Sequence, residues 1–213
     1  MNSGKMTVDK RLQLLEAAEQ LFAEKDFDAV SVRELAKVAG VNIAMISYYF
    51  GSKEKLFQAL IEQKMQVSLA AIQEISERNI PALEKIKNIA EMQVDRIMQN
   101  RRFQRIISRE MLHNTRPELN NFIVEGINKN RRHIYAIVEQ GIKKKELRKV
   151  DVEMVLMSVF ATITHIVTAC NYSRQVFMKN SEDDLFTQQF KQRVKNHLKE
   201  LLTAMLAVDK KTN

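Results

Sequence analysis

The stretch Ser31–Lys53, SVRELAKVAGVNIAMISYYFGSK, is the feature that most constrains the fold of this chain. Ser31 followed three residues later by Glu34 is a capping box, which predicts the start of a helix. Gly40 can take the left-handed conformation that ends a helix, and Asn42 can cap a second one. Two short helices joined by so tight a turn predict a helix-turn-helix.

The apolar spacing within this stretch agrees with that prediction. Ala36 is small enough for two helices to cross closely, and Ile46 can fill the core beneath them. Phe50, four residues after Ile46, shares its inward face. The second helix then presents its other side chains outward: Ile43, Ala44, Met45, Ser47, Tyr48 and Tyr49.

The whole chain is predicted to be all-α. Its 213 residues contain only five Gly and two Pro, and no apolar-polar alternation with strand-type turns is found. Helical periodicity predicts about nine helices, near residues 7–25, 31–39, 42–50, 52–78, 81–98, 103–111, 117–141, 151–172 and 184–207. Gly141 either ends the seventh of these helices or is absorbed into it.

Several classes of protein are not expected. The longest apolar runs are broken before ~18 residues, so no membrane span is predicted, and the N-terminus has no apolar signal core. A single cysteine, Cys170, fits a reducing cytoplasm. His113 and His133 lack partners at metal-ligand spacing. No catalytic constellation is found, so no enzyme, metal or cofactor is predicted.

Charge does not point to the helix-turn-helix. The net charge is +8, but residues 1–60 hold eight Lys or Arg and eight Asp or Glu. The basic excess therefore lies after residue 60. The cluster Arg101–Arg109 and the run Lys143–Lys149 either bind an anionic partner or are solvated surfaces, and the sequence leaves both open.

Residues 12–61 resemble the DNA-binding domain of the TetR family of transcriptional regulators. The matching segments are LLEAAEQLFAEKDFDAVSVRELAKVAGV and MISYYFGSKEKLFQALI. The resemblance implies a helix-turn-helix domain over residues 1–51 and a helical effector-binding and dimerisation domain over 52–213. A helix from about 52 to 78 would link the two.

The resemblance also implies roles in binding double-stranded DNA. Ser31 and Arg33 would contact phosphates, and Lys53 would pair with a phosphate at the start of the fourth helix. The family often has Tyr where this chain has Ser47, and His where it has Tyr49. The predicted DNA-binding residues are Ser31, Arg33, Asn42, Ile43, Ala44, Met45, Ser47, Tyr48, Tyr49 and Lys53.

The side chains that would face base edges are unusually apolar. Ile43, Ala44 and Met45 cannot make the bidentate hydrogen bonds that select G or A, but they can pack on thymine methyl groups. We therefore expect an operator that favours A/T, with much of its specificity from DNA shape.

The later helices suggest an effector cavity and a dimer. Many Met and Phe side chains predict an apolar or amphipathic effector, whose acidic head Arg96 could hold. Helices 151–172 and 184–207 would pair with their symmetry mates in a homodimer, so a pseudo-palindromic operator is expected. The predicted pocket residues, for which ordinary core is the alternative, are Met92, Arg96, Phe103, Ile107, Met111, Phe122, Phe160, Thr164 and His165.

These features predict a ligand-responsive transcriptional repressor that an effector releases from DNA. A TetR-like activator is one alternative. A helical adaptor that uses the helix-turn-helix for protein contacts is another, and it would lack steeply salt-dependent DNA binding.

Overall fold

A computed structural model describes residues 3–113 and 116–208 of the chain, and side chains from residue 10 onward. The described part is all-α, with ten α-helices and two short 3₁₀ turns, which confirms the predicted fold class. The chain forms two compact units. Residues up to 67 and 105–126 make the first, and residues 68–104 and from 127 onward make the second.

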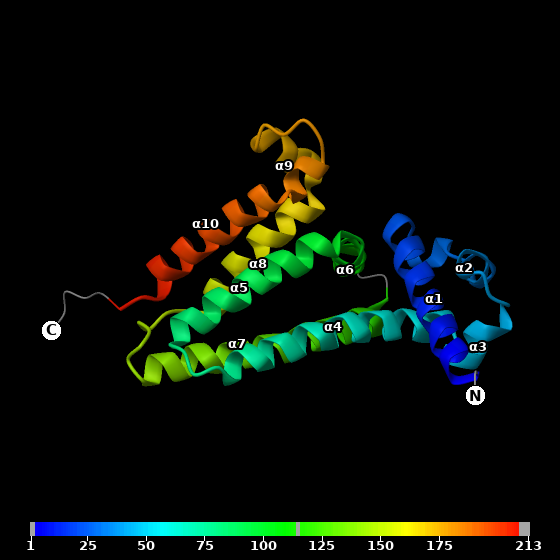
Figure 1. Ribbon diagram of the computed structural model, residues 1–213, viewed down its shortest axis with the longest axis horizontal. Helices are drawn as coiled ribbons and strands as arrows, with labels where there is room; N and C mark the ends of the chain where they lie inside the picture. Colours follow the sequence, from blue (N-terminus) through cyan, green and yellow to red (C-terminus); the bar gives the residue numbers. More distant parts are fainter. Residues whose placement is uncertain (1–2, 114–115, 209–213) are drawn as a thin grey trace. The chain divides into compact units, whose positions relative to one another are not determined.

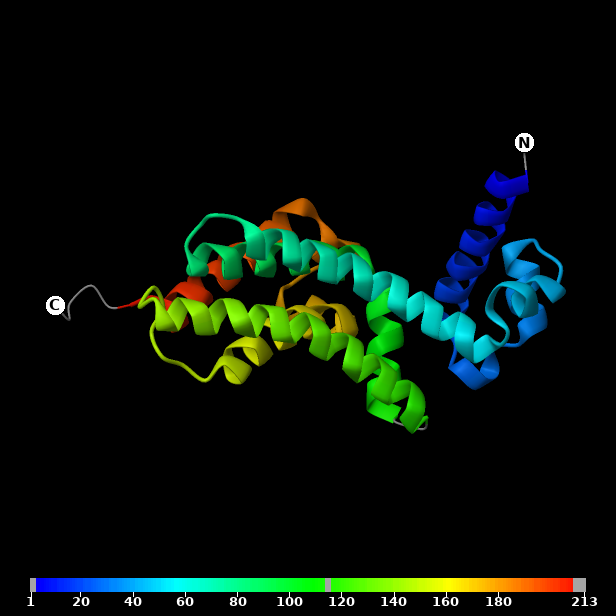
Figure 2. The same cartoon turned by 90° about the horizontal axis from the view of Figure 1, so that it is seen from below.

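The first unit contains the helix-turn-helix. Figures 1 and 2 show α1, α2, α3 and the start of α4 gathered into one bundle. Its core holds Phe22, Phe27 and Phe57, whose ring centroids lie 4.9 to 5.3 Å apart. The helices that begin in this unit are α1 (Ser3–Glu24), α2 (Val32–Ala39), α3 (Ala44–Phe50), α4 (Lys53–Glu77) and α7 (Pro117–Lys143), with the turn η1 at Phe27–Ala29.

The second unit is a helical bundle in which α5 packs against α8 and α10, as Figure 1 shows. Its apolar core also takes buried residues from the end of α4 and from α7, such as Ile72 and Ile134. The helices that begin in this unit are α5 (Ala82–Gln99), α6 (Arg101–His113), α8 (Val152–Thr168), α9 (Cys170–Val176) and α10 (Gln188–Leu206), with the turn η2 at Asp183–Phe186.

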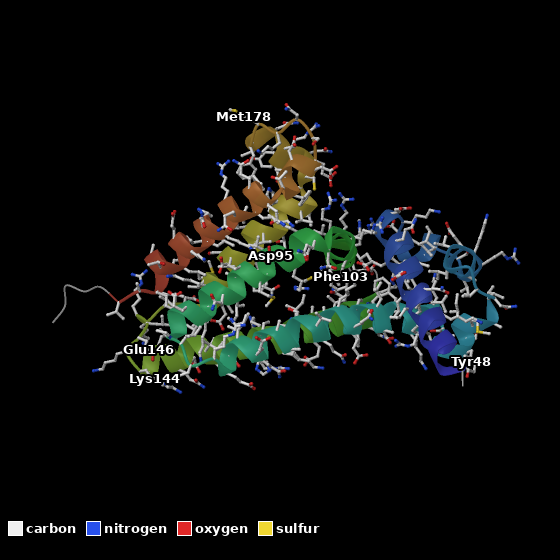
Figure 3. All side chains as sticks on the ribbon, viewed as in Figure 1. Tyr48, Asp95, Phe103, Lys144, Glu146 and Met178 are labelled. Carbon is white, nitrogen blue, oxygen red and sulfur yellow. The ribbon has the colours of Figure 1, made fainter. Side chains whose placement is uncertain are left out.

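The end of α7 and the residues that follow it are fixed by contacts with α5 and with the residue after α10. Gly141 is absorbed into α7, and a Cβ there would lie 2.7 Å from both Ala82 Cβ and Leu147 Cδ1, so only glycine fits without displacement. Glu146, labelled in Figure 3, accepts a hydrogen bond of 2.8 Å from the backbone N–H of Ala82 and so caps α5. Leu147 forms an isolated antiparallel bridge with Ala207.

The predicted single helix 151–172 is wrong. It breaks at Ala169, whose backbone (φ −105°, ψ 46°) is not helical, and α9 continues at a bend of 100°. Before the break, four Ser or Thr hydroxyls donate to the carbonyl four residues earlier, the last being Thr168 to Thr164. Such back-bonding bends helices, and its effect is not visible in apolar periodicity.

The last helix also begins later than predicted. Residues 183–186 form the turn η2, and α10 starts after Thr187, whose hydroxyl accepts a hydrogen bond from Phe190 N–H. No single described helix is long and apolar enough to span a membrane. The bent pair α8–α9 would pass by length and composition only when taken together.

Candidate DNA-binding site

The start of α2 is built as its sequence predicts. Ser31 Oγ accepts a hydrogen bond of 3.1 Å from Glu34 N–H. The ammonium of Lys25 lies 2.6 Å from the Glu34 carboxylate. This hydrogen bond, more than any other contact, lowers the pKa of Glu34, and a backbone hydrogen bond from Ser31 lowers it further. Arg33, the second residue of α2, is exposed and available to a phosphate.

The turn between α2 and α3 has the geometry of a helix-turn-helix. Gly40 has φ +65°, and Val41 N–H donates to Ala36 O at 3.0 Å, which closes the end of α2. Ala36 is only 4% exposed, so a larger side chain there would have to displace its packed neighbours. Asn42 Oδ1 accepts from Ala44 N–H at 2.9 Å and so caps α3.

One face of α3 is buried and the other is open. Ile46 and Phe50 are buried, while Tyr48 is 75% and Ile43 47% exposed. Figure 3 shows Tyr48 pointing away from the bundle. The Tyr48 and Tyr49 rings meet edge to face at a centroid distance of 4.9 Å. The remaining predicted contact residues are also accessible: Asn42, Ala44 and Ser47 are exposed, and Met45 and Tyr49 are partly buried.

Lys53 is held more tightly than a simple phosphate contact requires. Its ammonium donates to the carbonyls of Phe27 and Val30, both at 2.9 Å, and lies 4.2 Å from the centroid of the Phe27 ring. Since an ammonium has three N–H donors, one is left for a phosphate. Lys53 therefore ties the start of α4 to the loop before α2, and its predicted phosphate contact stays a prediction.

Two arginines that the sequence does not assign to this unit support the end of α1 and the loop before α2. Arg109 donates to the carbonyls of Phe22 and Ala23 at the end of α1. Arg116 lies 2.7 Å from the Asp28 carboxylate and 2.9 Å from Glu110. Arg109 lies more than eighty residues from Phe22 and Ala23 along the chain, and Arg116 lies similarly far from Asp28. No local pattern in the sequence indicates such pairings.

The predicted effector residues are divided between the two units. Ile107, Met111 and Phe122 lie in the first unit, and the other six, namely Met92, Arg96, Phe103, Phe160, Thr164 and His165, lie in the second. Of these nine, Phe103 and Ile107 are buried, whereas Met111 and His165 are exposed. The pocket as a whole stays a prediction.

Two other features of the described residues bear on ligand binding. A groove of about 590 Å³ runs along α10 and is lined by Gln189, Gln192, Arg193, Asn196, His197 and Glu200, none of which belongs to the predicted pocket. Among the described residues, no group of three or more His, Cys, Asp or Glu is placed to hold a metal ion.

A capped two-helix motif whose second helix exposes an apolar and hydroxyl-bearing face defines a helix-turn-helix DNA-binding protein. Residues 14–60 match the family model of bacterial regulatory proteins, tetR family. Residues 79–168 match the tetracyclin repressor-like C-terminal domain. The chain therefore belongs to the TetR family: it is a DNA-binding transcriptional regulator and not an enzyme.

Individual relatives agree with this assignment. The probable regulator YttP of Bacillus subtilis is 45% identical over 58 residues, which cover 27% of this chain and 28% of that protein. The fatty acid metabolism regulator protein of the same organism is 26% identical over 160 residues, covering 75% and 82%. The crystal structure of Bacillus subtilis FadR in complex with stearoyl-CoA is similar in fold, with a TM-score of 0.71 at 23% identity, covering 90% and 96%.

Proposed function

We propose that this protein is a homodimeric transcriptional repressor that binds a pseudo-palindromic operator and is released by a long-chain acyl effector. The observation that carries the DNA-binding part is the open face of α3, with Tyr48 and Ile43 exposed while Ile46 anchors the helix from behind. Arg33 and the N-terminus of α2 lie in the same motif and offer phosphate contacts.

The dimer is supported by an apolar stripe on α8. Met154 and Met157 are 59% and 64% exposed, and Ala161 and His165 continue the exposed face at helical spacing. A contiguous apolar face on one helix is typical of a protein interface. The exposed side chains of α10 that line the groove are polar, and they fit the rim of such an interface.

The class of effector is supported by the relatives and by composition. A curated relative is named for fatty acid metabolism, and a structure of similar fold contains stearoyl-CoA. Met92, Phe103 and Phe160, from α5, α6 and α8 of the second unit, would offer an adaptable apolar surface to such an effector. An acyl effector would favour a spacing of the two α3 helices that does not fit successive major grooves, with α4 as the lever between DNA and effector.

Selection of binding sites from a random pool of double-stranded DNA tests this function. We expect an inverted repeat of A/T-rich half-sites, because a two-fold dimer presents two copies of α3 and Ile43, Ala44 and Met45 favour thymine methyl groups. If no sequence is enriched, the proposal that the protein binds a specific operator is contradicted. Half-sites rich in G/C would contradict the role given to these three residues.

A further inference from the structure

A polar cluster lies inside the otherwise apolar second unit, at the contact between α4 and α5. Gln93 is 1% exposed and Ser68 is fully buried. Gln93 Nε2 donates to Ser68 Oγ at 3.2 Å, and Gln93 Oε1 accepts from Arg96 Nε at 2.9 Å. Gln93, itself fixed by Ser68, therefore fixes the position of the Arg96 guanidinium.

Arg96 carries its charge without a counter-charge from the described residues. Of its five N–H donors, only Nε has a side-chain partner among the described residues. Neither terminal amino group is a buried donor without a partner, so both are open to solvent or to a ligand. Burial lowers the pKa of Arg96 to about 10, so the group stays protonated at neutral pH. A partly buried guanidinium without a protein counter-charge is well suited to pair with an anionic ligand.

The acidic residues nearest in sequence cannot supply that partner. Asp95, labelled in Figure 3, is paired with Lys195 at 2.6 Å, and Glu91 is paired with Lys199 at 2.6 Å. Both lysines belong to α10, so these carboxylates are drawn to a different face of α5. Arg96 lies on another face of α5, the face that also carries Met92 four residues earlier.

The geometry points to Arg96, positioned by Gln93 and Ser68, as the binding site for the anionic head group of an apolar effector. A guanidinium presents two parallel N–H groups to a carboxylate or a phosphate, and such charge-assisted pairs are among the strongest hydrogen bonds in proteins. Met92, one turn before Arg96 on α5, is partly buried and offers apolar surface for the tail. This inference rests on the proposed function, since it names the head-group site for that effector.

Isothermal titration calorimetry on the full chain tests the site with three probes that share one tail. Palmitate ends in a carboxylate, palmitoyl-CoA carries phosphates, and methyl palmitate has no charge. We expect Arg96→Met to weaken binding of the anionic probe that uses the site by about 10- to 100-fold, in line with the loss of a charge-assisted pair. Binding of methyl palmitate should not change. Whether palmitate or palmitoyl-CoA responds distinguishes a carboxylate from a phosphate.

Two further variants keep the test specific. Arg96→Lys retains the charge without the planar fork and should bind with intermediate affinity. Arg131→Met removes an exposed arginine of α7 and should behave as wild type. If Arg96→Met melts well below wild type, Arg96→Lys serves in its place, with a smaller loss expected.

The inference and the proposed function fail in different ways. If palmitoyl-CoA releases the wild type and Arg96→Met equally from DNA, and calorimetry shows equal binding of all three probes, the head-group site is wrong while the repressor stands. If neither anionic probe binds the wild type, the head-group site is overturned, and operator binding without effector still tests the DNA-binding function separately.

Discussion

Replacing Arg33 and Tyr48 together by alanine should weaken binding to the selected operator about 100-fold at physiological salt. Each side chain is exposed beside the recognition face, and each lost phosphate contact costs about tenfold, or roughly 1.4 kcal/mol. The charge of residues 1–60 is balanced, so affinity depends on a few placed groups and not on a basic surface. Fluorescence anisotropy with labelled operator measures the effect.

The salt dependence of the same variant gives an independent check. Loss of the Arg33 contact should reduce the slope of log K against log salt by about one. The matched control is Arg131→Ala, an exposed arginine of α7 with the same change of charge, which should leave affinity and slope unchanged. Equal losses in both variants would mean that α3 is not the surface that binds DNA.

Replacing Arg116 by alanine should lower the free energy of unfolding by about 3 kcal/mol. Its guanidinium pairs with Glu110, a residue only 8% exposed, and also lies 4.4 Å from the Phe27 ring centroid. Without Arg116 the Glu110 carboxylate is left buried and unpaired. Thermal unfolding followed by circular dichroism should show a melting temperature about 6–12 °C lower.

A second substitution separates the ion pair from simple packing. Glu110→Met combined with Arg116→Met removes both charges and should recover most of the lost stability, because an apolar pair carries no buried charge. The exposed Asp28→Ala variant, which breaks only the outer contact of Arg116, should cost less than about 1 kcal/mol. A melting temperature for Arg116→Ala equal to that of wild type would show that this pair does not stabilise the unit.

The features that could be predicted from sequence are those set by local rules. Ser31 and Asn42 cap helices through hydrogen bonds that span only two or three residues, and Gly40 takes the positive φ that favours glycine. Ala36 and Ile46 follow from helical spacing alone. The helix-turn-helix could therefore be derived almost residue by residue.

The remaining features depend on partners distant in the chain or on competition between weak effects. Arg109 contacts the end of α1 and Arg116 the loop before α2, each across more than eighty residues. The sequence predicts only a phosphate contact for Lys53, whereas its ammonium donates to two backbone carbonyls. The break at Ala169 directly follows Thr168, whose hydroxyl bonds back to the Thr164 carbonyl, and hydrophobic periodicity carries no signal for it.

The central claim is that operator and effector, when bound to this protein, each weaken the binding of the other. Its most direct test is the anisotropy of labelled selected operator bound to the wild-type chain during titration with palmitoyl-CoA. We predict that the operator is released, and that saturating operator weakens palmitoyl-CoA binding by the same factor, as linkage requires. An operator affinity that does not change while calorimetry shows palmitoyl-CoA bound would contradict the account.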